Sequence, residues 1–247
     1  MIRITIENKE YTTQEIQRWQ EKRVQSSKRK LKKWLKRSIN VADADQLALF
    51  KSQIDFEIIP VSLKNELRFS SFCTGIVVRL SGKRRKLSVA EIDVDFCDAK
   101  TMHSLYDEMM LHNTPENKLC CLRANPDHYL LQGIGNDVQE VMEITGGLPV
   151  VSLFDICYGD FSGLRSEQED DYPVQAAGVS YLKNGLAIGA VRHQMKDTPQ
   201  GCHVTLTVEF PALMPKRNIR AHQYHLACEF YNWFTEFEKR VKEGKVQ

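Results

Sequence analysis

The sequence lacks the short motifs that would assign it to a common enzyme class. It contains no Walker A loop, no GxGxxG turn, no GxSxG elbow and no HExxH pair. Each motif serves one mechanism, so their absence disfavours P-loop and Rossmann nucleotide binding, α/β-hydrolase chemistry and zincin-type proteolysis. The seven cysteines include no CxxC spacing, and most lie within apolar segments. This favours reduced, buried thiols over a disulfide framework or a zinc knuckle.

Long apolar runs are also missing. No run approaches the roughly 18 residues that a membrane-spanning helix requires. The first residues alternate between apolar and polar side chains, unlike a secretory signal peptide. Hydrophobic residues make up 42% of the 247 residues and charged residues 27%, which is ordinary for a globular protein. We therefore expect a cytoplasmic protein of one or two domains.

Positive charge is concentrated in the first part of the chain. Residues 1–40 contain 12 Lys/Arg and 4 Asp/Glu, whereas the whole chain has a net charge of +2. A short alternating strand precedes a predicted helix that starts after Thr12, where Glu15 completes a capping box. Trp19 and Trp34 lie on the apolar face of this helix. We predict that residues 1–40 form an N-terminal strand and basic helix beside a core domain at 41–247.

The basic side of this helix suggests an anionic partner. The segment KRKLKKWLKR at 28–37 has seven basic residues in ten. Such a helix could bind nucleic acid, a nucleotide, a membrane surface or an acidic protein through residues 18–37, or it could be the solvated face of a packed helix. The candidate anion-binding residues are Lys28, Arg29, Lys32, Lys33, Lys36 and Arg37 on the helix, and Lys83, Arg84 and Arg85 in a later loop.

The middle of the chain predicts mainly antiparallel strands. Three of them form a meander joined in part by a basic hairpin loop at 81–86, and their ranges are 53–61, 66–80 and 87–96. Further along, the patterns predict a helix at 100–112, strands at 118–122 and 128–132, a short helix within 133–147 and a central strand at 149–158. The polar segment at 159–173 is long enough for a lid or a binding loop, or its acids simply keep it soluble.

One predicted strand carries three acids on a single face. Glu91, Asp93 and Asp95 alternate with apolar residues, and side chains two positions apart share a face of a strand. Neighbouring carboxylates repel one another unless the face is solvated or a cation lies between them. Oxygen ligands suit Mg²⁺ or Mn²⁺, so these residues are candidate metal ligands. The alternative is a solvent-facing strand whose acids pair with Lys or Arg of a neighbour.

The same segment, AEIDVDF at 90–96, is similar to the hhhDhD metal motif of archaeo-eukaryotic primase-polymerases. That family also has a histidine after a further strand and a later carboxylate. The resemblance would place His128 and Asp155 at those positions, although Pro126 stands where the family has a small residue. What the resemblance implies is a divalent metal site, and it covers this segment alone.

A hairpin is the clearest local prediction. Asn184-Gly185 lies between two alternating segments, 174–183 and 186–195, and this dipeptide favours a type I′ turn. The turn predicts that Tyr181 faces Ile188, Val179 faces Ala190, Ala177 faces Arg192, Ser180 faces Gly189 and Ala176 faces His193. One face of this hairpin therefore carries small side chains, which leave room for a helix or a ligand.

The C-terminal part predicts a strand at 203–210 and a long helix from about residue 217. An apolar stripe runs along the helix through Ile219, Leu226, Phe230, Trp233 and Phe237. His222, His225 and Glu229 border this stripe one turn apart, so they are candidate catalytic residues for metal binding or proton transfer. The alternative is an amphipathic boundary with His–Glu pairing. If the acids at 91–95 faced this flank, the two groups would form one site.

Together these patterns predict an α+β fold, with an antiparallel sheet packed against a long C-terminal helix and an N-terminal basic amphipathic helix. The order of elements resembles the helix-grip arrangement of START-type ligand-binding domains. We favour a binding protein that engages a small molecule, a nucleotide or an anionic macromolecule through a sheet–helix cavity and the basic helix. The alternative is a divalent-metal-dependent enzyme for a nucleic-acid or phosphate-bearing substrate, with Mg²⁺ or Mn²⁺ at Asp93 and Asp95.

Overall fold

The computed structural model describes residues 1–55, 61–135 and 137–245. Its helices are α1 (Thr13–Leu35), α2 (Ala44–Ser52), α3 (Val61–Ser81), α4 (Ala99–Leu111), α5 (Pro115–Ala124), α6 (Lys216–Lys242) and the short 3-10 turn η1 (Thr145–Gly147). Its strands are β1 (Ile2–Ile6), β2 (Lys9–Tyr11), β3 (Arg85–Val94), β4 (His128–Gly133), β5 (Val138–Glu143), β6 (Ser152–Tyr158), β7 (Val174–Leu182), β8 (Ala187–Thr198) and β9 (Gly201–Pro211).

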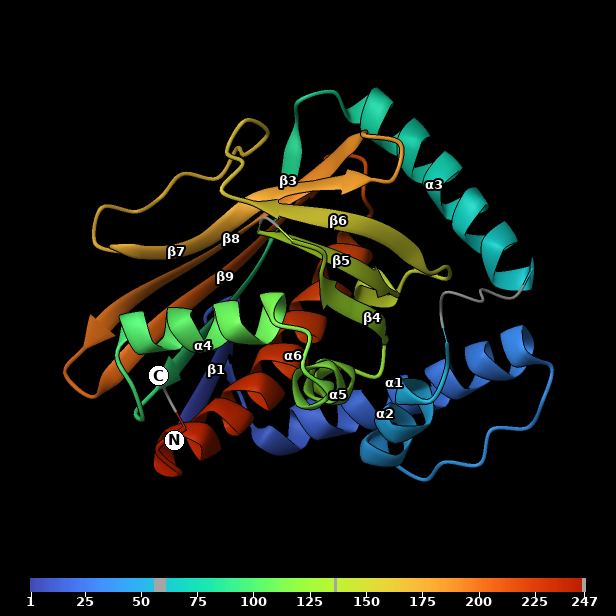
Figure 1. Ribbon diagram of the computed structural model, residues 1–247. Coiled ribbons are helices and arrows are strands. Elements are labelled where there is room, and N and C mark those ends of the chain that lie inside the picture. Colours follow the sequence, from blue (N-terminus) through green and yellow to red (C-terminus); the bar gives the residue numbers. More distant parts are fainter. Residues whose placement is uncertain (56–60, 136, 246–247) are drawn as a thin grey trace.

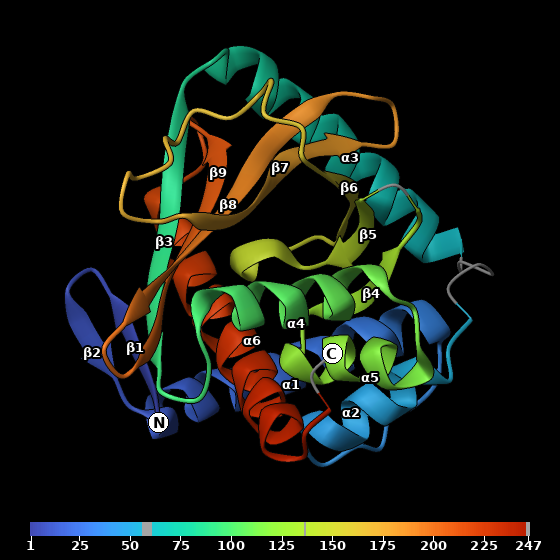
Figure 2. The ribbon, with the colours of Figure 1, turned by 60° about the vertical axis from the view of Figure 1, so that its left-hand side comes forward.

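These strands form one antiparallel sheet in the order β2-β1-β3-β9-β8-β7-β6-β5-β4. The sheet curves around α6, and α1, α4 and α5 lie on the same side as α6 (Figure 1). Figure 2 shows α6 running along the concave face below β3, β8 and β9. The predicted α+β class, with an antiparallel sheet packed against a long C-terminal helix, is confirmed.

The apolar stripe of α6 is the centre of the main core. Leu226, Phe230, Trp233 and Phe237 are all at most 3% exposed. They pack against the inner faces of β3 and β9, where Ala90, Ile92, Val204 and Leu206 are likewise buried. Burial of one such large side chain contributes about 1.5–3 kcal/mol, so this stripe holds the helix in the curve of the sheet.

The predicted β7–β8 hairpin is present and turns at Asn184-Gly185, but the predicted type I′ turn was wrong, because that type needs a positive φ at both residues and only Gly185 has one. Gly185 has a φ of +81°, a conformation that glycine adopts without strain. Four predicted pairs are confirmed, and they are Val179–Ala190, Ala177–Arg192, Ser180–Gly189 and Ala176–His193. The fifth was wrong, because the register shifts after Ser180 and Tyr181 lies opposite Ala187 instead of Ile188.

The predicted meander before β3 was wrong. Residues 66–80 are part of helix α3, and β3 pairs with β1 and β9. The buried positions of α3 include Leu63, Glu66 and Ser70, which follow helical spacing. The basic loop joins α3 to β3 and is not a hairpin connection. Most of the strand predicted at 53–61 lies outside the described residues.

Two further predictions between α4 and β6 were wrong. Residues 118–122 belong to helix α5, which starts at Pro115 with Thr114 as a side-chain cap. Proline at the first helical position and a threonine cap favour a helix there. The segment 133–147 contains strand β5 and the turn η1 in place of a helix. The alternation of VQEVME fits this strand, which pairs with both β4 and β6.

Residues 1–40 contribute to the sheet and to both cores. Strand β1 pairs with β3, so it lies within the sheet. Ile16 of α1 is buried in the main core, and Val24, Leu31 and Trp34 are buried in a second core beneath β4 and β5. A boundary at residue 40 stays a prediction, and its test is a truncation.

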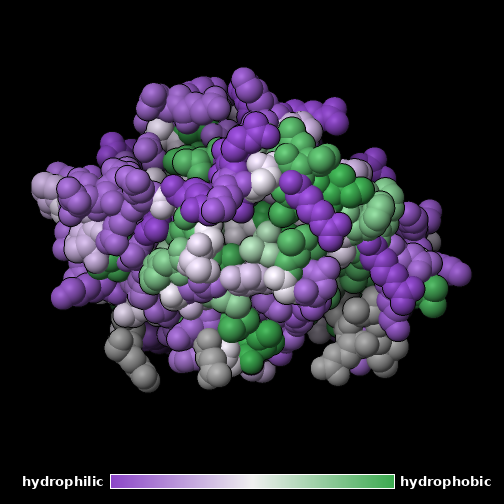
Figure 3. Space-filling model, turned by 90° about the horizontal axis from the view of Figure 1, so that it is seen from above, coloured by the Kyte–Doolittle hydropathy of each residue, from purple (hydrophilic) through white to green (hydrophobic). Residues whose placement is uncertain are grey.

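Helix α3 has an exposed apolar face. Phe69, Phe72, Ile76 and Leu80 follow helical spacing and are 41–66% exposed. Figure 3 shows apolar side chains gathered on the side of the molecule where α3 lies. In the described part of the chain, no helix is both long and apolar enough to cross a membrane.

Candidate functional site

A cavity of about 740 Å³ lies between the concave face of the sheet and α6. Its walls come from β5–β9, from one side of α3 and α4, and from α6. Ser180 and Gly189 lie on its wall, so the small side chains predicted on this hairpin face do border open space. Most of the lining is apolar, and the ionisable side chains of Glu143, His225 and Glu229 reach it from β5 and α6.

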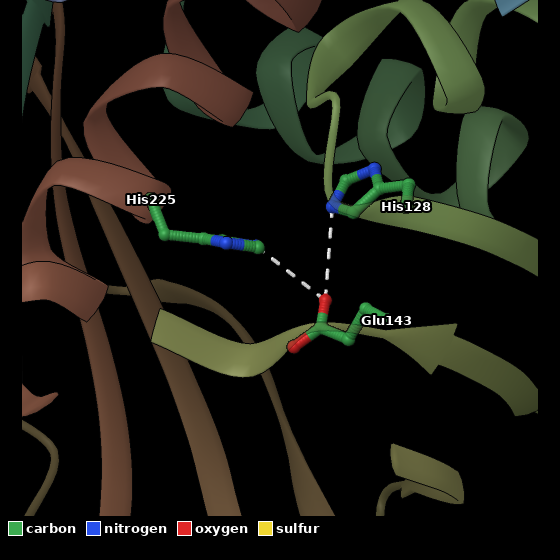
Figure 4. Close-up of side chains that lie close together, drawn as sticks. All are labelled: His128, Glu143 and His225. Atoms are coloured by element: carbon green, nitrogen blue, oxygen red, sulfur yellow. Dashed lines mark ion pairs between the residues drawn. The ribbon is translucent and has the colours of Figure 1, made fainter. Parts of the chain in front are cut away.

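Four ionisable side chains meet beside this cavity. His128 is the first residue of β4 and pairs with Glu143 at the end of β5. His225 and Glu229 lie one turn apart on α6. Figure 4 shows His128 and His225 pointing toward the same oxygen of Glu143, with His225 on the helix and the other two on the strands. All four residues are buried.

The distances between these groups are short and similar. The Nε2 atom of His128 is 3.7 Å from Glu143 Oε2 and 3.4 Å from Glu229 Oε1. The Nε2 atom of His225 is 3.4 Å from Glu143 Oε2 and 3.7 Å from Glu229 Oε2. Each imidazole therefore faces both carboxylates, an arrangement that can share a proton or hold a cation.

The hydrogen bonding of His128 determines which of its nitrogens carries the proton. Its Nδ1 lies 2.7 Å from the backbone carbonyl of Cys121. A carbonyl only accepts, so Nδ1–H donates and Nε2 of the neutral ring is left as an acceptor. That Nε2 has no hydrogen-bond partner among the described residues, and the same holds for both ring nitrogens of His225.

Burial and mutual charge shift the pKa values of this cluster in opposite directions. Burial, together with the charge of His225, lowers the pKa of His128 to about 3. Burial also acts to lower the pKa of His225, but Glu143 and Glu229 outweigh it and raise that pKa. Burial raises the pKa of Glu229, whereas the charge of His225 overcomes burial at Glu143 and lowers its pKa. The mutual attraction of His225 and Glu143 thus offsets the burial of both groups, whereas burial dominates at His128 and Glu229.

The predicted trio of His222, His225 and Glu229 is only partly brought together. His222 stacks on His225 with ring centroids 5.3 Å apart, but its Nδ1 hydrogen-bonds with Ser88 Oγ at 2.9 Å. His225 and Glu229 face each other, and they also face His128 of β4 and Glu143 of β5. Glu143 is absent from the predicted trio, because the helix predicted within 133–147 gives no strand pairing with His128. A catalytic role for the trio stays a prediction.

The acidic face of β3 does not meet the α6 flank. Ser88 of β3 contacts His222, so Glu91 and Asp93, at odd positions, point away from α6. Asp93 pairs with His203 Nδ1 at 2.7 Å and with Arg3 at 3.5 Å. The idea that the acids and the helix flank form one site was therefore wrong.

Asp95 pairs with the N-terminal amino group of Met1, so two of the three acids have basic partners. A Mg²⁺ or Mn²⁺ site at Glu91, Asp93 and Asp95 stays a prediction. The primase-like arrangement is not assembled, because His128 lies in the buried cluster and Asp155 of β6 pairs with Lys183 at 2.6 Å.

The predicted anion-binding residues form two separate groups. Figures 1 and 2 place α1 and the α3–β3 connection at opposite ends of the molecule. Lys28 donates to the carbonyl of Val41, and the Arg85 side chain is mostly buried near Glu209. The other members of the two groups are exposed, and they are Arg29, Lys32, Lys33, Lys36, Arg37, Lys83 and Arg84.

The long polar loop at 159–173 contains no helix or strand, as predicted. Glu209 Oε1 accepts hydrogen bonds from the backbone N–H groups of Arg165 and Ser166, at 2.8 and 2.6 Å. Glu209 lies on the face of β9 opposite Val208, which faces the core. The loop therefore packs on the convex side of the sheet and is not a lid over the cavity.

Comparison with known proteins leaves the family open. No protein-family model matches the chain, and no curated protein matches it either. Among solved structures, Ara h 8.0201 is 11% identical with a TM-score of 0.37, over 65% of this chain and 99% of that one. Human STARD10 is 12% identical with a TM-score of 0.37, over 64% of each chain. An uncharacterized protein from Rhizobium leguminosarum is 12% identical with a TM-score of 0.35, over 64% of this chain and 96% of that one.

These identities and TM-scores are too low to support an argument about function. The fold and the site define an α+β protein with a cavity between its sheet and its C-terminal helix.

Proposed function

We propose that this protein binds a largely apolar small molecule in the cavity between the sheet and α6. The observation that carries the proposal is the cavity itself. At about 740 Å³ it falls within the roughly 300–1,000 Å³ range of pockets that enclose small ligands. A tightly packed core leaves few voids larger than a water molecule, so a cavity of this size needs an explanation.

The distribution of polar groups suggests the shape of the ligand. Apolar side chains such as Val191, Val208 and Leu226 cover most of the wall. Glu143, His225 and Glu229 form a polar region on one side. A ligand with an apolar body and one hydrogen-bonding end would match both regions, because an unpaired polar group on either side would cost about 1–3 kcal/mol.

Filling the cavity is expected to abolish binding. Ser180→Phe introduces a large side chain on the cavity wall, and Val208→Trp does so from β9. We expect the affinity for N-phenyl-1-naphthylamine, an uncharged apolar fluorophore, to fall at least ~10-fold in each variant, equivalent to about 1.4 kcal/mol. Fluorescence titration measures this affinity. Native mass spectrometry of the purified wild type would show whether a cellular ligand accompanies the protein.

Ser180→Ala is the matched control, because it removes the same hydroxyl without adding volume. It should bind the fluorophore like the wild type. Equal binding by the wild type and both filled variants would mean that the dye sits elsewhere, for example on the exposed face of α3, and the proposal would be wrong. Circular dichroism checks that each variant is folded.

We further propose that the exposed basic face of α1 binds an anionic macromolecule. Arg29, Lys32, Lys33 and Lys36 are exposed and have no ion pair within the described part of the chain. Duplex DNA is the simplest probe, since its phosphates attract clustered Lys and Arg irrespective of sequence. The alternative is a metal-dependent enzyme acting on nucleic acid, with the acids of β3 as its metal ligands. These acids lie on a different surface from the basic face of α1, and the alternative stays a prediction.

Reversing these four charges is expected to weaken DNA binding at least ~10-fold at low salt and to flatten its salt dependence. Fluorescence anisotropy with a labelled duplex at several salt concentrations gives both quantities. The control reverses Lys64, Arg68 and Arg79 of α3 and Lys216 at the start of α6, which are also exposed. Both variants change the net charge equally. If both lose the same affinity, binding is non-specific and α1 is not a dedicated surface.

A further inference from the structure

The spacing of three buried ligand atoms, from His128, Glu143 and His225, fits a metal ion better than a proton network. The four His–Glu distances lie between 3.4 and 3.7 Å, too long for hydrogen bonds of normal length. In a tetrahedral zinc site with bonds of roughly 2.0 Å, neighbouring ligand atoms lie about 3.3 Å apart. The ligand atoms of His128, Glu143 and His225 all lie within 4.8 Å of one another.

The unpartnered nitrogens point to the same occupant. His128 Nε2 is fully buried and faces two carboxylates, yet its proton-bearing nitrogen is already engaged with Cys121. An acceptor that faces two carboxyl groups needs a proton or a cation between them. A backbone carbonyl on the second nitrogen is also the usual support of a metal-bound histidine, since it holds the ring in the ligating tautomer.

We infer that His128, His225 and Glu143 bind a divalent first-row metal ion, with Glu229 as the adjacent carboxylate that completes the set and Zn²⁺ as the first candidate. Two imidazoles and two carboxylates suit Zn²⁺, and also Fe²⁺ or Mn²⁺, better than the all-oxygen ligands that Mg²⁺ and Ca²⁺ prefer. The apolar rings of Trp19 and Trp233 pack near His225 and His128, at 6.3 and 6.0 Å between centroids, and shield the site from bulk water.

The site opens toward the ligand cavity. Glu143, His225 and Glu229 line that cavity, whereas His128 closes the site from behind. A bound ion would therefore be reachable by the polar end of a molecule in the cavity. The metal site does not depend on the proposed ligand, because it rests on the four side chains alone.

Metal analysis and titration of tag-free full-length protein test the site. Elemental analysis after purification, and calorimetric titration of chelator-treated protein with Zn²⁺, Mn²⁺ and Fe²⁺, should show one ion per chain. Zn²⁺ at 100 times its dissociation constant should raise the thermal midpoint by roughly 5–10 °C. Glu143→Gln keeps the shape of the side chain and should weaken binding at least ~100-fold, with no midpoint shift.

Asp171→Asn is the matched control, because it removes an exposed carboxylate that pairs with Lys196 outside the cluster and should leave the stoichiometry unchanged. Glu229→Gln replaces Glu143→Gln if the latter does not fold, as judged by circular dichroism. No bound ion in any titration, or equal binding by the wild type and the folded Glu→Gln variant, would overturn the inference. Fluorophore binding is scored separately, so failure of the metal site and failure of the ligand proposal give different results.

Discussion

Deletion of residues 1–40 is expected to abolish the folded state of the remaining chain. The deletion removes β1 from the sheet and the buried side chains Ile16, Val24, Leu31 and Trp34 of α1. Each such side chain contributes about 1.5–3 kcal/mol by burial. Their combined loss is comparable with the roughly 5–15 kcal/mol by which a typical domain is stable. Size-exclusion chromatography and a thermal melt by circular dichroism measure the outcome.

The charge-reversed α1 variant is the control for this truncation. It changes Arg29, Lys32, Lys33 and Lys36 on the exposed side of the helix and leaves the buried side intact. It should therefore melt cooperatively, close to the wild type. A soluble, monomeric fragment of residues 41–247 with a cooperative transition would contradict our expectation and would establish the domain boundary at residue 40.

The elements that sequence reasoning predicted best have strong local signals. Helix α6 carries an apolar stripe that continues for several turns, and its buried residues follow that stripe. The β7–β8 hairpin has Asn184-Gly185 at its turn, and this dipeptide favours a hairpin there. In both cases the pattern belongs to a single segment, so no distant part of the chain is needed to interpret it.

Helix α3 was misinterpreted because its apolar residues do not lie on one face. Leu63 and Val78 are buried, whereas Phe69, Phe72 and Leu80 are exposed on the other side. A helix with apolar residues on both sides lacks the usual contrast between an apolar and a polar face. Its sequence pattern therefore resembles that of a buried strand. The exposed apolar face of α3 and the failure of the prediction thus have the same origin.

The candidate site shows a different limit. His225 and Glu229 could be predicted together, because a separation of four residues places them on one side of a helix. Their partners His128 and Glu143 come from strands whose pairing depends on the whole sheet. Whether the acids of β3 face the same site depends on how the strand packs, and the alternation of the strand directs Asp93 to the other face.

Asp127→Ala is expected to lower the free energy of unfolding by about 3–5 kcal/mol, because removal of one partner leaves a buried charge unpaired. Asp127 is fully buried and accepts two hydrogen bonds from Arg23 of α1, at 2.6 and 2.9 Å. Lys51 is also buried, and its ammonium donates to the carbonyls of Pro126 and His128. Burial lowers the pKa of Lys51 to about 7, and the charge of Asp127 opposes that shift. Loss of Asp127 would leave the Arg23 guanidinium without a counter-ion and would remove the nearby charge that favours protonated Lys51.

Urea denaturation with linear extrapolation measures this loss, and a double-mutant cycle with Arg23→Ala tests its cause. Burial raises the pKa of Asp127 even though Arg23 acts to lower it, so the pair itself pays a desolvation cost. The double variant should therefore be less destabilised than the two single variants combined, by about 0.5–3 kcal/mol. Asp171→Ala, which breaks the exposed pair with Lys196, should leave the unfolding midpoint close to the wild type. Additive losses at Arg23 and Asp127 would show that each residue acts through packing, and that the ion pair does not hold α1 against β4.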